Sequence, residues 1–202
     1  MLAALFWCGG ALAADKTILV WGDSISAGLG LDADTGWVHL LDRRLQSQGS
    51  GYAVVNASVS GETTAGGLSR LPAALDKLHP AIVLIELGGN DGLRGQPLDA
   101  MHADLGKMIE LSRAAHAQPV LFAMQIPSNY GPVYADRFAK VFGTVAGETK
   151  APLVPFFLAA IATDRGRWFQ DDGIHPNAAA QPQLLDAVWP TLAPLLKPSA
   201  HP

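Results

Sequence analysis

The segment TILVWGDS, residues 17–24, decides the fold class: a mostly apolar run ends at Gly22 and is followed at once by Asp23 and Ser24. An unbroken apolar run, without alternating polar residues, is typical of a parallel strand that is covered on both faces. Gly22 is expected to permit a tight turn after this strand. Ser24 would then begin the next helix, with its hydroxyl facing the cleft.

Further segments of the same kind alternate with helical ones along the chain. The expected strands are residues 17–22, 52–57, 81–87, 119–125 and a shorter one at 152–156, and the expected helices are residues 37–46, 64–78, 97–115, 130–149 and 176–196. This alternation predicts an α/β fold, a three-layer α/β/α sandwich with a central five-stranded parallel sheet of flavodoxin-like type. We expect one domain over residues 14–197 and a loose tail at 198–202.

The composition fits one compact domain that binds small molecules. Of 202 residues, 49% are hydrophobic and 16% charged, enough to build a sizeable core. The net charge of -4 provides no basic surface for a nucleic acid partner. We expect a monomer that acts on a small-molecule substrate, with no nucleic acid partner and no stable insertion into a membrane.

Residues 1–13 resemble a signal peptide, because they are almost wholly apolar and end in Ala-Leu-Ala, a pattern typical of cleavage sites. The usual positive charge at the start is missing, as in a truncated signal, since the first lysine is Lys16. A buried strand or helix is the alternative. Cleavage would remove Cys8, the only cysteine, and with it any disulfide. A lipid anchor on Cys8 is a weaker alternative, because bulky Trp7 precedes it. We expect a periplasmic or secreted protein.

The loops that follow the strands contain the residues suited to catalysis, because ligands of open parallel sheets bind beyond the carboxyl ends of the strands. Among six histidines, only His175 falls in such a loop. Asp172, three residues earlier and across a glycine, could accept a hydrogen bond from Nδ1 and leave Nε2 to take the proton of Ser24. Asp171 is the second candidate. A helix-capping turn and a metal site are the alternatives.

Two other such loops could supply hydrogen-bond donors to an oxyanion. Gly61 lacks a Cβ, so its backbone N–H could approach a substrate closely. Asn90 could present its side-chain amide to the same point, and the N–H of Ser24 would be free at the start of a helix. Taken singly, each loop could also be an ordinary turn.

With these four blocks in place, the chain resembles the SGNH hydrolases, also called the GDSL family. The matching blocks are Gly22-Asp23-Ser24, Gly61, Gly89-Asn90-Asp91 and Asp172-Gly173-Ile174-His175-Pro176. The likeness is greatest to the bacterial thioesterase I, arylesterase and lysophospholipase group. It implies Ser24 as nucleophile, an oxyanion hole of Ser24, Gly61 and Asn90, a triad completed by Asp172 and His175, and no cofactor or metal.

The expected function is therefore that of a serine esterase that hydrolyses carboxylic esters or thioesters, such as aryl esters, acyl thioesters and lysophospholipids. Apolar residues in the same loops would bind the acyl or aryl group: Ile25, Leu29, Leu93, Ile126, Tyr130 and Ile174. Loop 125–131 looks shorter than its counterparts in the group. Three alternatives are an α/β-hydrolase, in which Ser26 would replace the last glycine of G-x-S-x-G, a flavodoxin-like binding module and a non-catalytic lipid-binding domain.

Overall fold

The computed structural model describes residues 16–196, so the expected signal peptide with Cys8 and the expected tail lie outside the described residues. Within this range the chain forms one five-stranded parallel sheet, with strand order β2-β1-β3-β4-β5. The strands are β1 (Lys16–Gly22), β2 (Tyr52–Asn56), β3 (Ile82–Glu86), β4 (Gln118–Phe122) and β5 (Leu153–Val154).

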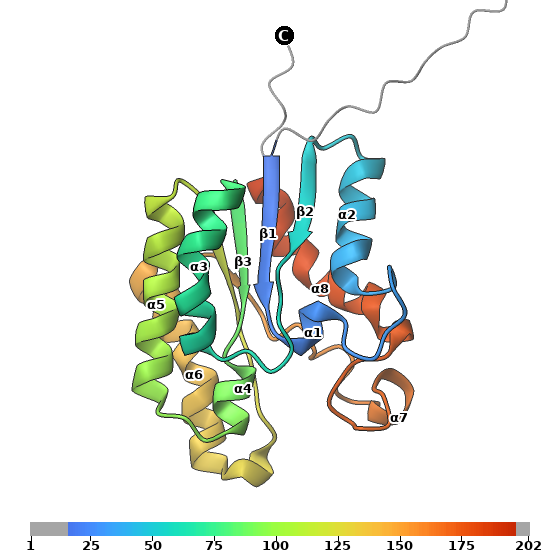
Figure 1. Ribbon diagram of the computed structural model, residues 1–202. Helices are drawn as coiled ribbons and strands as arrows, with labels where there is room; N and C mark the ends of the chain where they lie inside the picture. Colours follow the sequence, from blue (N-terminus) through green and yellow to red (C-terminus); the bar gives the residue numbers. More distant parts are fainter. Residues whose placement is uncertain (1–15, 197–202) are drawn as a thin grey trace, which may run out of the picture.

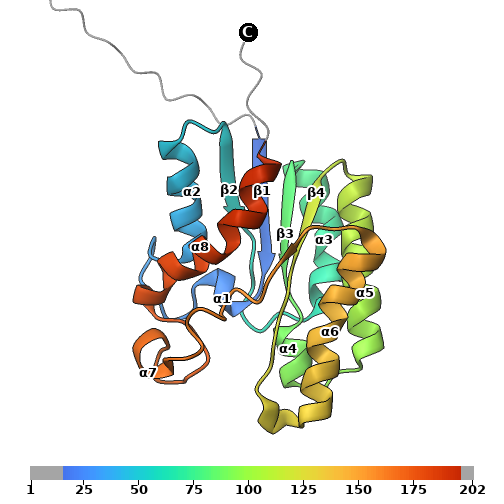
Figure 2. The ribbon, with the colours of Figure 1, turned by 180° about the vertical axis from the view of Figure 1, so that it is seen from behind.

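Helices cover both faces of the sheet, which confirms the three-layer α/β/α prediction (Figures 1 and 2). One layer holds α3 (Thr64–Leu78), α5 (Leu98–Ala114) and α6 (Pro132–Thr149), which pack side by side. The opposite layer holds α2 (Trp37–Ser47) and α8 (Gln181–Leu192). Three short helices lie in the loops, namely α1 (Ser24–Ala27), α4 (Gly89–Leu93) and α7 (Arg165–Trp168).

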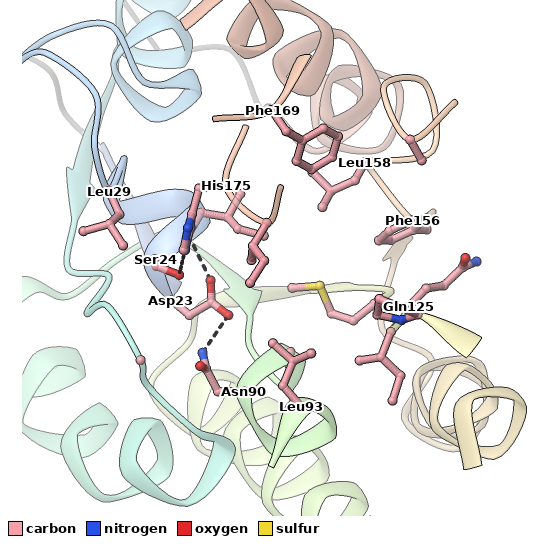
Figure 3. A pocket seen from close by; sticks show the side chains of 18 of the residues that line it. Asp23, Ser24, Leu29, Asn90, Leu93, Gln125, Phe156, Leu158, Phe169 and His175 are labelled. Atoms are coloured by element: carbon pink, nitrogen blue, oxygen red, sulfur yellow. Dashed lines mark hydrogen bonds between the residues drawn. The ribbon is translucent and has the colours of Figure 1, made fainter. Parts of the chain in front are cut away.

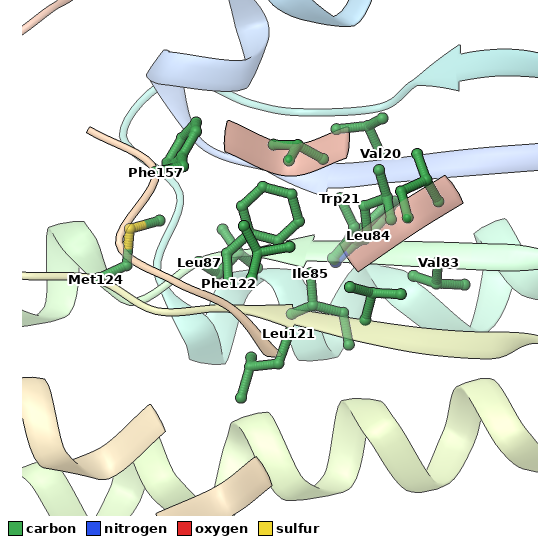
Figure 4. Close-up of a cluster of buried hydrophobic side chains, with 14 of the residues drawn as sticks. Val20, Trp21, Val83, Leu84, Ile85, Leu87, Leu121, Phe122, Met124 and Phe157 are labelled. Atoms are coloured by element: carbon green, nitrogen blue, oxygen red, sulfur yellow. The ribbon is translucent and has the colours of Figure 1, made fainter. Parts of the chain in front are cut away.

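The core lies on both sides of the central strands, β1 and β3, whose apolar residues are almost fully buried (Figure 4). Trp37, Phe122 and Phe157 pack together there, with ring centroids 5.3–6.2 Å apart. Full burial of a phenylalanine contributes roughly 1.5–3 kcal/mol. These contacts hold the sheet rigid beneath the loops at its carboxyl edge.

The parallel register brings the post-strand loops to one edge of the sheet. Gly22 at the end of β1 pairs with Glu86 at the end of β3, and Val20 pairs with Asn56 at the end of β2. The chain therefore leaves these three neighbouring strands at nearly the same level. Ser24, Gly61 and Asn90 follow within a few residues.

Several element boundaries differ from the sequence prediction. Strand β4 ends at Phe122 rather than at residue 125, and α6 begins at Pro132 because Gly131 adopts φ +100. The last helix does not begin at Pro176, since Pro176 forms an antiparallel bridge with Phe169; α8 starts only at Gln181. Helices α4 and α7 were not predicted.

No helix of residues 16–196 has both the length and the apolar character needed to cross a membrane.

Candidate active site

Ser24 is the first residue of α1, directly after β1. The Asp23 side chain caps this helix, accepting from the backbone N–H of Ile25 at 3.0 Å. Because α1 is a single turn, its contribution is free N–H groups rather than the dipole of a long helix. The N–H of Ser24 donates to no acceptor within the described chain.

Ser24, His175 and Asp172 form a continuous hydrogen-bonded chain, as the sequence predicts. The Ser24 hydroxyl lies 2.8 Å from His175 Nε2 (Figure 3). On the other side of the ring, His175 Nδ1 lies 2.6 Å from Asp172 Oδ2. This is the geometry in which an imidazole can take the serine proton while a carboxylate fixes its tautomer.

The turn from Asp172 to His175 holds this geometry. Asp172 Oδ1 accepts from the backbone N–H groups of Ile174 and His175 at 2.8 and 3.0 Å. Gly173 adopts φ +65, which a glycine tolerates at little cost, and its carbonyl accepts from Arg165. The turn therefore orients the His175 ring through Asp172, which the alternative of a simple helix cap does not explain.

The carboxylate of this triad is strongly favoured in its charged form. The hydrogen bond from His175, followed by those from the two backbone N–H groups, lowers the pKa of Asp172 to about 2. Asp171, the second candidate, makes no hydrogen bond to His175.

Gly61 and Asn90 lie opposite the nucleophile and line the same cavity. Gly61 adopts φ +78, and its N–H has no acceptor within residues 16–196. Arg94 Nη2 donates to the Gly61 carbonyl at 2.9 Å. One hydrogen of the Asn90 amide points to Asp23 Oδ2, with Nδ2 at 3.1 Å, which leaves the second hydrogen for a ligand (Figure 3).

A buried carboxylate links these two loops. Asp91 accepts from the backbone N–H of Thr64 at 2.9 Å and from its hydroxyl at 2.6 Å. Thr64 begins α3 just after the Gly61 loop, and Asp91 lies in α4 beside Asn90. The link fixes the two candidate donors relative to one another.

Two more buried carboxyls, those of Asp23 and Glu86, lie at the base of the turn that carries Ser24. Burial raises the pKa of Asp23 to about 6, against the opposing effect of its hydrogen bonds and of His175. Burial, and then the charge of Asp23, raises the pKa of Glu86 well above its ordinary value. Both of these buried carboxyls therefore resist ionisation more than exposed carboxyls do.

The cavity beside Ser24 has a volume of about 520 Å³ and a mainly apolar lining. Five of the six predicted apolar residues line it: Ile25, Leu29, Leu93, Ile126 and Ile174. Tyr130, the sixth, is not among the residues that line the cavity, and its side chain is 46% exposed. The 3-10 turn Ser128–Tyr130 and Gly131 carry it outward.

The sequence prediction missed one wall of the cavity, which is built from Met124, Phe156, Leu158 and Phe169 (Figure 3). Met124 was assigned to β4 and Phe156 to β5, but both strands end earlier, so the chain enters the cavity. Phe169 is placed by its bridge to Pro176. For Phe156, Leu158 and Phe169, the only signal in the sequence was the apolar character of the long segment after β5.

Within residues 16–196, no group of three or more His, Cys, Asp or Glu side chains is arranged to hold a metal ion.

Comparison with known families decides what this site belongs to. The pattern of the GDSL-like lipase/acylhydrolase family matches residues 20–181, which include all four blocks, the end of β1 and the other four strands of the sheet. The chain belongs to this family. A GDSL-family chain with its nucleophile directly after β1 is not an α/β-hydrolase, so that alternative is set aside.

Individual relatives agree with the family assignment. Esterase TesA of Pseudomonas aeruginosa is 55% identical over 184 residues, covering 91% of both chains. The protein of Escherichia coli named thioesterase 1/protease 1/lysophospholipase L1 is 44% identical over 91% of this chain and 86% of its own. The crystal structure of the esterase EstA from Pseudoalteromonas sp., inhibited by monoethylphosphonate, superposes with a TM-score of 0.86 at 42% identity, over 90% of this chain and 99% of that one. The chain is an SGNH-type ester hydrolase.

Proposed function

We propose that the protein hydrolyses carboxylic esters and thioesters through an acyl-enzyme on Ser24, with His175 as general base and Asp172 as its orienting carboxylate. The observation that carries the proposal is the 2.8 Å contact between the Ser24 hydroxyl and His175 Nε2, with Asp172 at 2.6 Å on the other ring nitrogen. A helix cap needs no imidazole there.

The residues divide the reaction into two balanced halves. Ser24 Oγ attacks the acyl carbon while His175 Nε2 takes the hydroxyl proton, which gives a tetrahedral oxyanion. Collapse breaks the bond to the leaving alcohol or thiol, which takes that proton from His175. Water then attacks the acyl-enzyme with His175 again as base, and Ser24 and a carboxylic acid are released.

We assign the oxyanion hole to the N–H groups of Ser24 and Gly61 and to the free hydrogen of the Asn90 amide. All three residues line the cavity. Donors that are fixed before the reaction stabilise the charge as it develops and need not reorganise. The bonds from Asn90 to Asp23 and from Thr64 to Asp91 provide that fixation.

The cavity supports an apolar acyl or aryl group as substrate. Its walls are aliphatic and aromatic, and Leu29 and Ile174 at its rim are about half exposed. Aryl esters, acyl thioesters and lysophospholipids all provide such a group next to the bond to be cleaved. The names of relatives as thioesterase, lysophospholipase and arylesterase support these three classes.

We also propose that the protein is exported to the periplasm or secreted, because residues 1–13 have the apolar character and the Ala-Leu-Ala ending of a signal peptide. Expression with residues 1–15 intact, followed by cell fractionation and N-terminal sequencing, tests this. Cytoplasmic protein that retains Met1 would contradict it.

A substrate panel tests the activity. We expect p-nitrophenyl esters of graded chain length and acyl thioesters to be hydrolysed by the wild type, and Ser24→Ala to be inactive but folded. Inertness of the wild type toward both a phosphonate probe and every ester would favour a non-catalytic binding module. Near wild-type turnover by Ser24→Ala would refute the assignment of the nucleophile.

A further inference from the structure

Glu86 is a buried carboxyl that the proposed mechanism does not use. It is the last residue of β3, and its side chain is fully buried beneath the nucleophile turn. Its Oε2 accepts from the backbone N–H of Asp23 at 3.2 Å and from the hydroxyl of Ser26 at 2.5 Å. Asp23 directly precedes Ser24 and Ser26 lies two residues after it, so one oxygen atom holds both sides of the turn that carries the nucleophile.

The neighbouring strand leaves room for this side chain. Gly22 pairs with Glu86 across β1 and β3, and a Cβ on Gly22 would lie 2.5 Å from Glu86 Oε2 and 2.8 Å from the Cβ of Ser26. Gly22 is not in the left-handed region. The missing Cβ of Gly22 therefore also lets Glu86 approach the backbone at the turn from β1 into α1.

The burial of Glu86 costs folding free energy, because one of its carboxyl oxygens loses its hydrogen bonds to water. Its second oxygen, Oε1, is buried without a hydrogen-bond partner among the described residues. A buried polar atom that gives up its hydrogen bonds to water without a new partner destabilises the folded state. If this position served packing alone, an apolar side chain would fill it at a lower cost in folding free energy.

The contacts of Glu86 continue to the proposed oxyanion hole. Asp23, held at its N–H by Glu86, accepts from the Ile25 N–H with Oδ1 and from Asn90 Nδ2 with Oδ2. Figure 3 shows the Asp23 side chain between Ser24 and Asn90. A shift of the Asp23 backbone would therefore move the nucleophile and an oxyanion donor together.

We propose that Glu86 is a positioning residue for ester hydrolysis, which acts as a buried acceptor that fixes the turn carrying Ser24 and, through Asp23, the amide of Asn90. The inference rests on the proposed function of Ser24 and Asn90. Because Glu86 touches neither substrate nor reacting atoms, its loss should slow the chemical step and leave substrate binding unchanged.

Two substitutions at one position separate positioning from general stability. Glu86→Gln keeps an uncharged acceptor for the two bonds, and Glu86→Met keeps the volume but removes the acceptor. We expect kcat close to wild type for Glu86→Gln and a fall of roughly tenfold to a hundredfold for Glu86→Met, with KM unchanged in both. Ser112→Ala, which removes another buried hydroxyl bond far from the site, is the control and should leave kcat unchanged.

The outcomes are distinct. Wild-type kcat in folded Glu86→Met, or an equal fall in both Glu86 variants, would overturn the proposal. If Glu86→Met does not fold, Ser26→Ala removes one of the two bonds without altering Glu86; we expect a smaller fall in kcat at constant KM, and an unchanged kcat would overturn the idea. Failure of the proposed function itself would appear separately, as turnover by Ser24→Ala.

Discussion

Replacement of Asn90 by alanine tests the proposed oxyanion hole most sharply. The Asn90 amide donates one hydrogen to Asp23 and has the other free toward the cavity, beside the N–H groups of Ser24 and Gly61, which have no acceptor among residues 16–196. Alanine therefore removes one of three donors and leaves two. A donor to an oxyanion is worth about 2.7–4 kcal/mol, so kcat should fall by roughly a hundredfold to a thousandfold.

The fall should lie in kcat rather than KM, because the ester carbonyl of the bound substrate carries far less charge than the oxyanion. The assay is steady-state hydrolysis of a p-nitrophenyl ester, with thermal melting to confirm folding. Asn129→Ala is the matched control, since Asn129 is exposed and does not line the cavity. A change in kcat of less than about threefold in folded Asn90→Ala would refute the assignment.

Three further substitutions test the surroundings of the site. Asp172→Asn should lower kcat by roughly a hundredfold to ten-thousandfold, because it disturbs the His175 tautomer; the neighbouring Asp171→Asn should not, and equal losses would contradict the triad. Gly22→Ala should lower the free energy of unfolding by about 1–3 kcal/mol in urea, because its Cβ meets Glu86, whereas Gly106→Ala, with open space around it, should not. Folding raises the pKa of Glu86 above its ordinary value of 4.5, so above that pH the folded protein binds a proton at Glu86 that the unfolded chain does not. The free energy of unfolding therefore falls as the pH rises above about 4.5. The fall is at most about 1.4 kcal/mol per pH unit and ends once the pH passes the pKa of the folded state. In urea titrations Glu86→Gln should therefore gain stability relative to wild type as the pH rises above about 4.5, and a constant difference would show that Glu86 does not titrate as described.

The sheet and the triad could be predicted because simple rules connect them to the sequence. Unbroken apolar runs gave the five strands, and parallel strands place their following loops at one edge. That edge singled out His175 among the histidines, and the Gly22-Asp23-Ser24 block at the helix start pointed to Ser24; the two residues are 151 positions apart and lie 2.8 Å from each other. Asp172 followed from its spacing.

The missed features depend on tertiary contacts that no local pattern encodes. Helix α4 was read as a turn because glycines dominate residues 88–92. Phe169 reaches the cavity through a bridge to Pro176, and Tyr130 turns away after Pro127. Glu86 resembled any polar residue at a strand end, and its burial appears only once β1 and the nucleophile turn lie over it.

Covalent labelling by a fluorophosphonate, followed by intact mass and peptide mapping, tests the central claim most directly. One adduct per chain on Ser24, lost in Ser24→Ala and strongly slowed in His175→Ala, is the expected result. Labelling of a different residue, or undiminished labelling of Ser24→Ala, would contradict the account.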